Sequence, residues 1–423
     1  MKSSPAAWVP SLYIAESLPY VAVMVIATTM YKRLGLSNTE LALYTSWLYL
    51  PWVIKPLWSP YIAAIKTERW WVLVMQLLIG AGFAGIAFTL PMSIWLQGSL
   101  AFFWILAFAS ATHDIAADGL YILGLSTHDQ SLYVGIRSTF YRIGTIFGQG
   151  LIVMFAGWLE RSNTVPMAWS IAFLVLAGLF LALTLWHSVA LPKLSPRPLP
   201  AQEETSVKGD STFWLPFKIF FTKPHIITAL LFMLLFRFPE GQLVKIANPF
   251  LLDNVEAGGL ALSTEAVGFV YGTVGIIGLT IGGLLGGWCV SRHGLKRWLW
   301  PMVLSISLPD LVYVYLASAE EPSLLLVNIC VFIEQFGYGF GFTAYMLYLV
   351  YFSQGERSTA VFSICTAFQA LGMMIPGMIA GWMADQLGYL NFFWWIVICC
   401  LVTFAVSAFI KIDPLYGIKK KAS

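Results

Sequence analysis

Residues 191–224, LPKLSPRPLPAQEETSVKGDSTFWLPFKIFFTKP, form the only long run of the sequence that is rich in both proline and charge. Such a composition is typical of a linker between packed regions. The end of the run alternates aromatic residues with Lys218, which predicts a short helix at a membrane surface. We therefore expect residues 191–225 to be a cytoplasmic linker with an interfacial helix, between residues 1–190 and 226–423.

Long apolar segments flank this linker, six before it and six after it. A helix that crosses roughly 30 Å of hydrocarbon needs about 20 mainly apolar residues. The segments of this kind are 8–31, 41–65, 70–90, 98–124, 131–158, 166–190, 226–250, 265–290, 298–317, 323–352, 358–383 and 391–411. They predict an all-α polytopic membrane protein with twelve transmembrane helices in two six-helix bundles. Glu16 and Pro19 interrupt the first segment, so we expect a retained helix rather than a signal peptide.

The composition of the 423 residues supports a membrane protein. Hydrophobic residues make up 59% and charged residues 11%, and the mean hydropathy is +0.77. Soluble domains contain about 45–50% apolar and about 25% charged residues. No polar stretch is long enough to fold by itself, which excludes a soluble catalytic or nucleic-acid-binding domain, and we expect no enzyme activity.

The five cysteines all lie within apolar segments of the second half. There is no CxxC motif and no histidine at ligand spacing. We expect buried thiols, and neither a metal centre nor another cofactor. The cysteines are Cys289, Cys330, Cys365, Cys399 and Cys400.

The distribution of positive charge predicts the orientation. When both termini are placed in the cytoplasm, most of the 24 lysine and arginine residues fall on cytoplasmic segments, and only Lys32, Arg33 and Arg161 fall outside. Cytoplasmic loops of membrane proteins carry an excess of lysine and arginine. We therefore expect both termini to be cytoplasmic.

Two pairs of similar segments predict that the halves are parallel repeats. FGQGLIVMFAGW (Phe147–Trp158) matches LGMMIPGMIAGW (Leu371–Trp382) in two glycines and the final tryptophan. The turns ERWW and KRWL pair Arg69 with Arg297 at a similar offset. Internal repeats of this kind are common in secondary transporters.

At this point the chain resembles the major facilitator superfamily. GGWCVSRHGLKRW (Gly286–Trp298) is similar to the cytoplasmic G-x-x-x-D-R-x-G-R-R signature of that superfamily, with Ser291 in place of the aspartate. The resemblance implies the major facilitator fold and a gating role for Arg292 and Arg297.

A narrower resemblance concerns the muropeptide permease and acetyl-CoA transporter family. ATHDIAADG (Ala111–Gly119) is similar to its QDIxxDG/A stretch, with His113 in place of glutamine, and Thr359–Phe393 is similar to its tenth-to-twelfth-span region. The resemblance implies import of bulky, usually anionic metabolites across a bacterial inner membrane, among them cell-wall fragments. Siderophore permeases are related.

Ionisable residues within the spans are the candidate site residues. A charge at the centre of a bilayer costs a few kcal/mol on insertion scales, so charges that are kept there usually face a partner or a cavity. The candidates are the acids Glu16, Asp114, Asp118, Asp310, Glu240 and Glu334 and the bases Lys55, Arg137, Arg142, Arg237 and Lys245.

Asp114 and Asp118 lie one turn apart on the same helix face. By depth, Asp114 is level with Arg142 and Asp118 with Arg137, so pairing between adjacent helices is predicted. One interpretation is a proton-coupling site near the substrate path, and the other is a permanent structural clamp, which we favour for Asp118 and Arg137. For His113 we favour a satisfied polar group over a proton relay.

The seventh span, LLFRFPEGQLVKIANP (234–249), is predicted to be interrupted and to form a binding site. Breaking a helix within the membrane frees backbone groups that need a polar environment. The polar residues around Pro239 and Gly241 are Arg237, Glu240, Gln242, Lys245 and Asn248. The alternative is that Arg237 and Glu240 simply neutralise each other.

In the tenth span, Glu334 is a second candidate for proton coupling, or a structural partner of Arg237 or Lys245. Trp47, Tyr20 and Tyr345 could stack on a sugar ring, although packing is the more ordinary role for such residues.

We expect a monomeric proton symporter that works by alternating access, with lipid, protons and one small molecule as its partners. Arg142, Arg237 and Lys245 would attract the substrate carboxylate at the midplane, and Asp114 or Glu334 would carry the proton. No Walker A motif is present. The expected substrate is a peptidoglycan-derived amino sugar or muropeptide.

Other functions stay open. A siderophore or an acyl-CoA is the alternative substrate. A channel, a receptor without transport and an intramembrane enzyme are remote alternatives, since His113 and Asp114 alone do not supply a catalytic constellation.

Overall fold

The computed structural model describes residues 4–193, 214–355, 357–414 and 416–417. The linker between 194 and 213 lies outside the described residues. The chain forms two compact units. Unit 1 comprises Met1–Gly35, Ile54–Gly209 and Ser263–Gly272, and unit 2 comprises Leu36–Val53, Asp210–Leu262 and Thr273–Ser423. Division of the chain at residues 191–225 stays a prediction.

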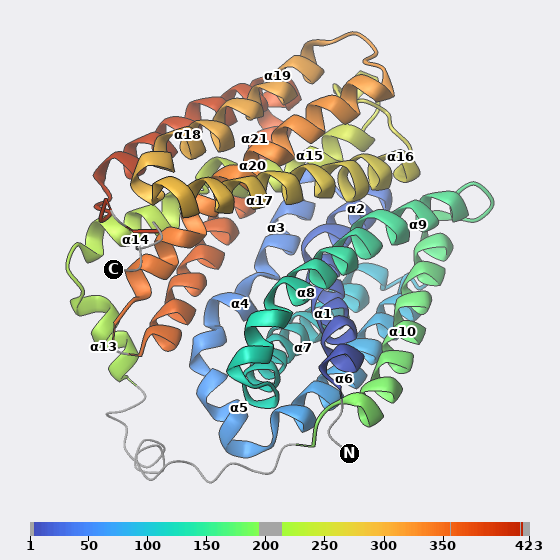
Figure 1. Cartoon of the computed structure of the whole chain (residues 1–423). Helices are drawn as coiled ribbons and strands as arrows, with labels where there is room; N and C mark the ends of the chain where they lie inside the picture. Colours follow the sequence, from blue (N-terminus) through green and yellow to red (C-terminus); the bar gives the residue numbers. More distant parts are fainter. Residues whose placement is uncertain (1–3, 194–213, 356, 415, 418–423) are drawn as a thin grey trace. The chain divides into compact units, whose positions relative to one another are not determined.

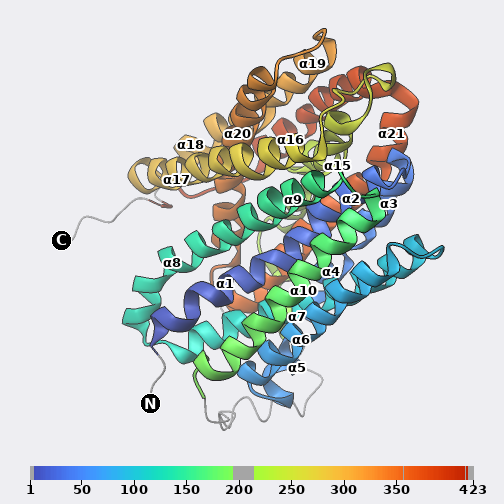
Figure 2. The same cartoon turned by 90° about the vertical axis from the view of Figure 1, so that its right-hand side faces the viewer.

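Unit 1 is a bundle of helices. Its helices are α1 (Pro5–Val21), α2 (Ala27–Arg33), α5 (Ser59–Ile65), α6 (Glu68–Thr89), α7 (Trp95–Gly124), α8 (Thr127–Thr145), α9 (Val153–Leu159), α10 (Val165–Ala190) and α16 (Thr264–Phe269). Helix α6 packs against α7 and α10, and α1 packs against α7 and α8 (Figures 1 and 2). Side chains of Thr67 and Ser126 cap the starts of α6 and α8.

Unit 2 is also helical. It contains α3 (Asn38–Trp47), most of α4 (Leu50–Ile54), α13 (Leu215–Thr222), α14 (Ile226–Leu235), α15 (Phe238–Leu252), α17 (Ile276–His293), α18 (Leu295–Ser307), α19 (Leu311–Ser318), α20 (Leu324–Ser353) and α21 (Ser358–Phe409). Helix α17 packs along α20, and α15 and α3 pack along α21. The predicted interfacial helix corresponds to α13.

Ten helices of the described chain are long and apolar enough to cross a membrane, and they cover eleven of the predicted spans. The longest, α21, contains two spans, because Gly388 takes φ 71° and breaks the helix there. The chain is therefore an all-α, multi-pass membrane protein.

The prediction of one continuous helix over 41–65 is wrong. This segment is divided into α3, α4, a 3₁₀ turn (Lys55–Leu57) and α5. The segment contains Pro51, Pro56 and Pro60. Proline has no backbone donor and its ring clashes with the preceding turn, so three prolines within ten residues prevent a regular helix.

Three π-helical turns widen the helices of the predicted first, fifth and eighth spans. They are Ala22–Ile26 between α1 and α2, Ile146–Ile152 between α8 and α9, and Val270–Gly275 between α16 and α17. Such turns are frequent at functional sites.

Candidate functional site

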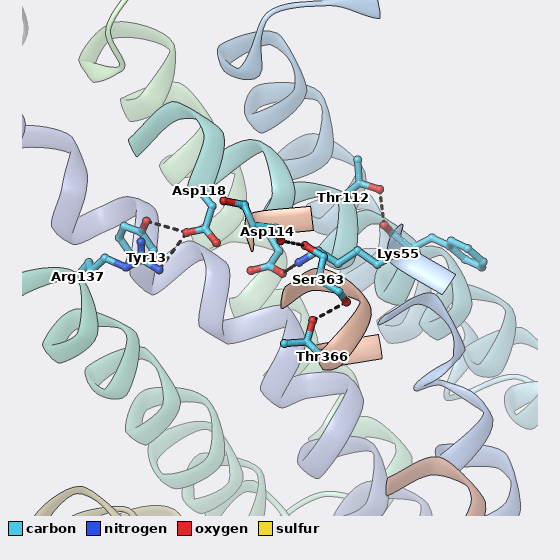
Figure 3. A network of polar contacts seen from close by, with 10 residues as sticks. Tyr13, Lys55, Thr112, Asp114, Asp118, Arg137, Ser363 and Thr366 are labelled. Atoms are coloured by element: carbon cyan, nitrogen blue, oxygen red, sulfur yellow. Dashed lines mark hydrogen bonds and ion pairs between the residues drawn. The ribbon is translucent and has the colours of Figure 1, made fainter. Parts of the chain in front are cut away.

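Six polar side chains of unit 1 form what we call the N-terminal cluster. They are Tyr13, Glu16, Lys55, Asp114, Asp118 and Arg137. Helices α1, α7 and α8 and the 3₁₀ turn at Lys55 supply them. Figure 3 shows Lys55 reaching Asp114, and Tyr13 and Arg137 reaching Asp118.

Asp114 forms an ion pair with Lys55, a partner that the sequence analysis did not predict. Arg142 is half-buried on α8, and its pairing with Asp114 stays a prediction. Counting residues from a turn gives the depth of a side chain but not the direction in which its helix faces. The interruption of the second span, which places Lys55 beside Asp114, could not be predicted from the sequence.

The carboxyl group of Glu16 lies beside that of Asp114, and the two groups interact electrostatically. Oε2 of Glu16 is buried without a hydrogen-bond partner in the described structure. A carboxyl group donates a hydrogen bond only when it carries a proton. One proton shared by Glu16 and Asp114 would therefore join the two groups and leave a single negative charge for Lys55 to balance.

Asp118 pairs with Arg137, as predicted. Arg137 Nη2 lies 3.0 Å from Asp118 Oδ1, to which the Tyr13 hydroxyl donates at 3.1 Å. The guanidinium carbon lies 4.6 Å from the ring centroid of Tyr13 and 4.9 Å from that of Tyr121. The aromatic faces and the carboxylate together hold this arginine in place, which suits a structural clamp.

His113 belongs to a buried polar chain that the sequence analysis did not foresee. Its Nε2 lies 3.1 Å from Gln76 Nε2, and Gln76 contacts His187, whose Nε2 lies 2.9 Å from Ser11 Oγ. Nδ1 of His113 is buried without a partner. The partners lie on α1, α6 and α10, far from His113 in sequence, and no local pattern links them.

The predicted break in the seventh span is confirmed. Helix α14 ends at Leu235 and α15 begins at Phe238, with Arg237 in the gap at φ −100° and ψ 21°. Pro239 does not itself end a helix here. It occupies the first turn of α15, where the backbone N–H that proline lacks would have no partner within the helix.

Arg237 is 7% exposed. Its Nη2 donates to the hydroxyl of Tyr338 at 2.5 Å, and its guanidinium carbon lies 4.7 Å from the ring centroid of Phe342. Nε has no partner. No ion pair joins it to Glu240 within the described chain, although the two charges attract each other over a longer distance.

Lys245, on α15, is a second buried base and is 1% exposed. Its Nζ donates to Thr45 Oγ1 at 3.0 Å and lies 5.0 Å from the ring centroid of Tyr49. Thr45 and Tyr49 come from segment 36–53. Both buried bases, Arg237 and Lys245, therefore contact hydroxyl and aromatic groups, and neither base forms an ion pair in the described residues.

Glu334 is buried on α20 and does not pair with Arg237 or Lys245 in the described structure. It accepts hydrogen bonds from the Tyr313 hydroxyl at 3.2 Å and from the Gln335 amide at 3.0 Å. It also repels Glu240 and Asp310 electrostatically.

Three further candidates for substrate contact occupy different environments. Tyr345 is fully buried, donates to Met233 O at 2.6 Å and stacks on Phe236. Gln242 is also buried, and its Oε1 accepts from Trp395 Nε1 at 2.9 Å. Trp47 is 41% exposed at the end of α3.

Arg292 and Arg297 are exposed beside the turn at Gly294, which takes φ 83° between α17 and α18. Arg292 lies 4.4 Å from the ring centroid of Trp288, and neither arginine forms an ion pair with another described residue. Their gating role stays a prediction.

Glu160 is a polar contact point that the sequence analysis did not single out. It pairs with Arg33 at 3.0 Å and accepts hydrogen bonds from Thr264 at 2.7 Å and Trp169 at 2.9 Å. It lies next to the close contact of α9 with α16. A Cβ added to Gly157 would lie 2.4 Å from the Glu265 backbone nitrogen.

The comparisons with known proteins agree with this fold. The family model described as Major Facilitator Superfamily matches residues 11–375. The anhydromuropeptide permease of Escherichia coli K12 is 24% identical over 81% of this chain and 67% of that protein. An uncharacterized protein of Haemophilus influenzae is 25% identical over 82% of this chain and 80% of that protein.

A solved structure shows the same fold at low identity. The nucleoside transporter NupG aligns with a TM-score of 0.69 and 16% identity, over 94% of this chain and 98% of that one.

Proposed function

Because this chain belongs to the Major Facilitator Superfamily, it is a multi-pass membrane transporter and not an enzyme, and we propose that it imports an anionic, peptidoglycan-derived amino sugar or muropeptide. The proposed location is a bacterial inner membrane, with both termini cytoplasmic. The transporter would work by alternating access, driven by protons.

The observation that carries the proposal is a pair of buried bases, Arg237 just before α15 and Lys245 on it. They are 7% and 1% exposed, each contacts a hydroxyl group and an aromatic ring, and neither forms an ion pair in the described structure, although Glu240 attracts Arg237. Burying a charge without an ionic partner is costly. An anionic substrate would supply the missing charge, and the aromatic rings beside both bases would contact sugar faces.

The relatives support the substrate class. The name of the Escherichia coli relative specifies an anhydromuropeptide, which carries amino sugars and carboxylates. A siderophore or an acyl-CoA is also anionic, so charge alone does not distinguish these substrates.

Proton coupling is supported by the closeness of the Glu16 and Asp114 carboxyl groups, which interact electrostatically. A proton on this pair would lie near Lys55, Asp118 and His113, so a change in the position of Lys55 would alter the affinity of the pair for that proton. Glu334 is the alternative proton carrier. Arg137 and Tyr13 would hold Asp118 in either case.

Counterflow in proteoliposomes tests the substrate. Vesicles loaded with unlabelled anhydromuropeptide should take up the labelled compound transiently, and an equal load of ferric siderophore or acyl-CoA should not support this uptake. Counterflow with a siderophore or an acyl-CoA alone would assign the substrate to that class instead.

A further inference from the structure

Two helices of unit 2 are interrupted beside the same small cavity. Helix α14 ends at Leu235 before the gap at Arg237, and α18 ends at Ser307 before the 3₁₀ turn Leu308–Asp310. Residues from both interruptions, together with α21, line the cavity: Phe236, Pro239, Glu240, Ile306, Ser307, Asp310 and Thr403. The centre of a water-sized sphere can occupy about 10 Å³ there, enough for one water molecule or one ion of similar size.

Oxygen atoms dominate the polar wall of this cavity. Glu240 and Asp310 contribute carboxylates, and both are less than 9% exposed. The Ser307 side chain is 4% exposed, and its Oγ is buried without a hydrogen-bond partner. Thr403 donates its proton to Phe236 O at 2.9 Å, which leaves the lone pairs of its hydroxyl oxygen to accept a contact.

Three acidic side chains lie close together at the cavity. Asp310 interacts electrostatically with Glu240 and Glu334, and its hydrogen-bonding contact is the Cys400 thiol at 3.4 Å. Arg237 is the one base that interacts with Glu240 in the described structure, and its own hydrogen bond goes to Tyr338.

We propose that this cavity binds a small monovalent cation, Na⁺, held by oxygens of Glu240, Asp310, Ser307 and Thr403. Interrupted membrane helices supply cation sites of this kind through helix C-terminal ends and polar side chains. The cation would allow neighbouring buried carboxyl groups to be ionised together, and it would give Ser307 Oγ a partner. A neutral water molecule could satisfy that hydroxyl but would not compensate the charge of ionised carboxyl groups.

A divalent ion fits less well. Ca²⁺ takes six to eight oxygen ligands and Mg²⁺ needs a near-ideal octahedron. No three His, Cys, Asp or Glu side chains converge as a metal-ion site in the described part of the chain. Two carboxylates and two hydroxyls in a cavity for one ion match Na⁺ more closely. The site lies in unit 2 and does not depend on the proposed substrate or on Asp114.

Thermal unfolding of the purified, detergent-solubilised full chain tests the proposal without substrate. Na⁺ should raise the Tm in a saturable way at constant ionic strength, whereas K⁺ and choline should not, because a ligand that binds only the folded state stabilises it. Asp310→Asn should raise the Tm in the absence of Na⁺, since it removes a repelling charge, and should abolish the shift with Na⁺. Misfolding cannot produce that combination.

A matched pair of serine variants completes the test. Ser307→Ala should weaken the apparent Na⁺ affinity by about 10-fold or more, as loss of a contact to a charged group implies. Ser305→Ala should not, since Ser305 Oγ donates to Gly337 O at 3.4 Å and is not among the cavity-lining residues.

Two results would overturn the proposal. One is the same Tm in Na⁺, K⁺ and choline. The other is stabilisation by acid alone without any effect of Na⁺, which would place a proton rather than a cation among Glu240, Asp310 and Glu334. Substrate counterflow measured in choline buffer is unaffected by either result, so failure here is distinct from failure of the proposed transport function.

Discussion

Arg237 holds a positive charge almost out of contact with solvent, beside one hydroxyl and two aromatic rings. A charge-assisted contact with a substrate carboxylate is worth roughly 1.5–3 kcal/mol. Arg237→Ala should therefore weaken substrate binding by about 10- to 100-fold, measured by the concentration dependence of counterflow. Tyr338→Phe, which keeps the charge and removes one hydrogen bond, should have a smaller effect.

Glu240→Ala and the double variant serve as controls for this prediction. Because no ion pair joins Arg237 to Glu240 in the described structure, removing Glu240 as well should not restore affinity. Recovery in the double variant would show that the two residues are a structural pair.

The residues proposed to couple transport to protons can each be tested by a single substitution. Asp114→Asn or Glu334→Gln should abolish uphill uptake while leaving substrate exchange largely intact, because exchange moves no net proton. Uptake under a proton gradient and counterflow without one, measured in the same vesicles, separate the two steps. Asp118→Asn should instead lower the Tm if Asp118 and Arg137 are a clamp. A variant of Asp114 that still concentrates substrate would exclude it as the carrier.

Some site residues and their contacts could be predicted from the sequence, and others could not. Composition and span length were sufficient to identify the buried charges, and the Asp118–Arg137 pair followed from depth alone. Lys55 as the partner of Asp114 could not be predicted, because its position depends on how Pro56 interrupts the segment. The contacts of His113 with Gln76 and of Glu160 with Thr264 join residues that no spacing rule connects.

At the scale of helices, glycines allow the close contact of α9 and the preceding π-helical turn with α16 and the turn that follows it. A Cβ on Gly272 would lie 2.3 Å from the Gly150 Cα atom, whereas a Cβ on Gly178 of α10 would meet no atom within 4 Å. Gly272→Ala should therefore lower the Tm, since overpacking typically costs about 1–3 kcal/mol. Gly178→Ala should be tolerated.

Thermal unfolding of these two variants in detergent provides the comparison. Equal Tm values for Gly272→Ala and Gly178→Ala would show that this helix contact does not contribute to stability. The glycine pattern of the fifth span was visible in the sequence, but its partner helix was not.

Most helices follow from apolar length, because a bilayer leaves few alternatives to a helix of about 20 residues. The exception is the second span. It is apolar enough for one helix, but its prolines divide it into shorter helical pieces. At Gly388 the opposite happens: the chain is helical on both sides, and a single residue with positive φ separates the two predicted spans.

For the whole molecule, the distribution of lysine and arginine predicts both termini in the cytoplasm. A reporter that is active only in the periplasm should be silent when fused near residue 205 or after Ser423, and active when fused near Gln97. Activity at residue 205 would mean the opposite orientation. Expression of each fusion, measured by immunoblot, controls for absence of the protein.

The central claim is that the chain uses protons to concentrate an anionic cell-wall fragment. The direct measurement is accumulation of labelled anhydromuropeptide by proteoliposomes with an acidic exterior, in choline buffer. The account predicts an internal concentration above the external one, which collapses when a protonophore is added. Uptake that stops at equal concentrations, or accumulation that a protonophore does not change, would contradict it.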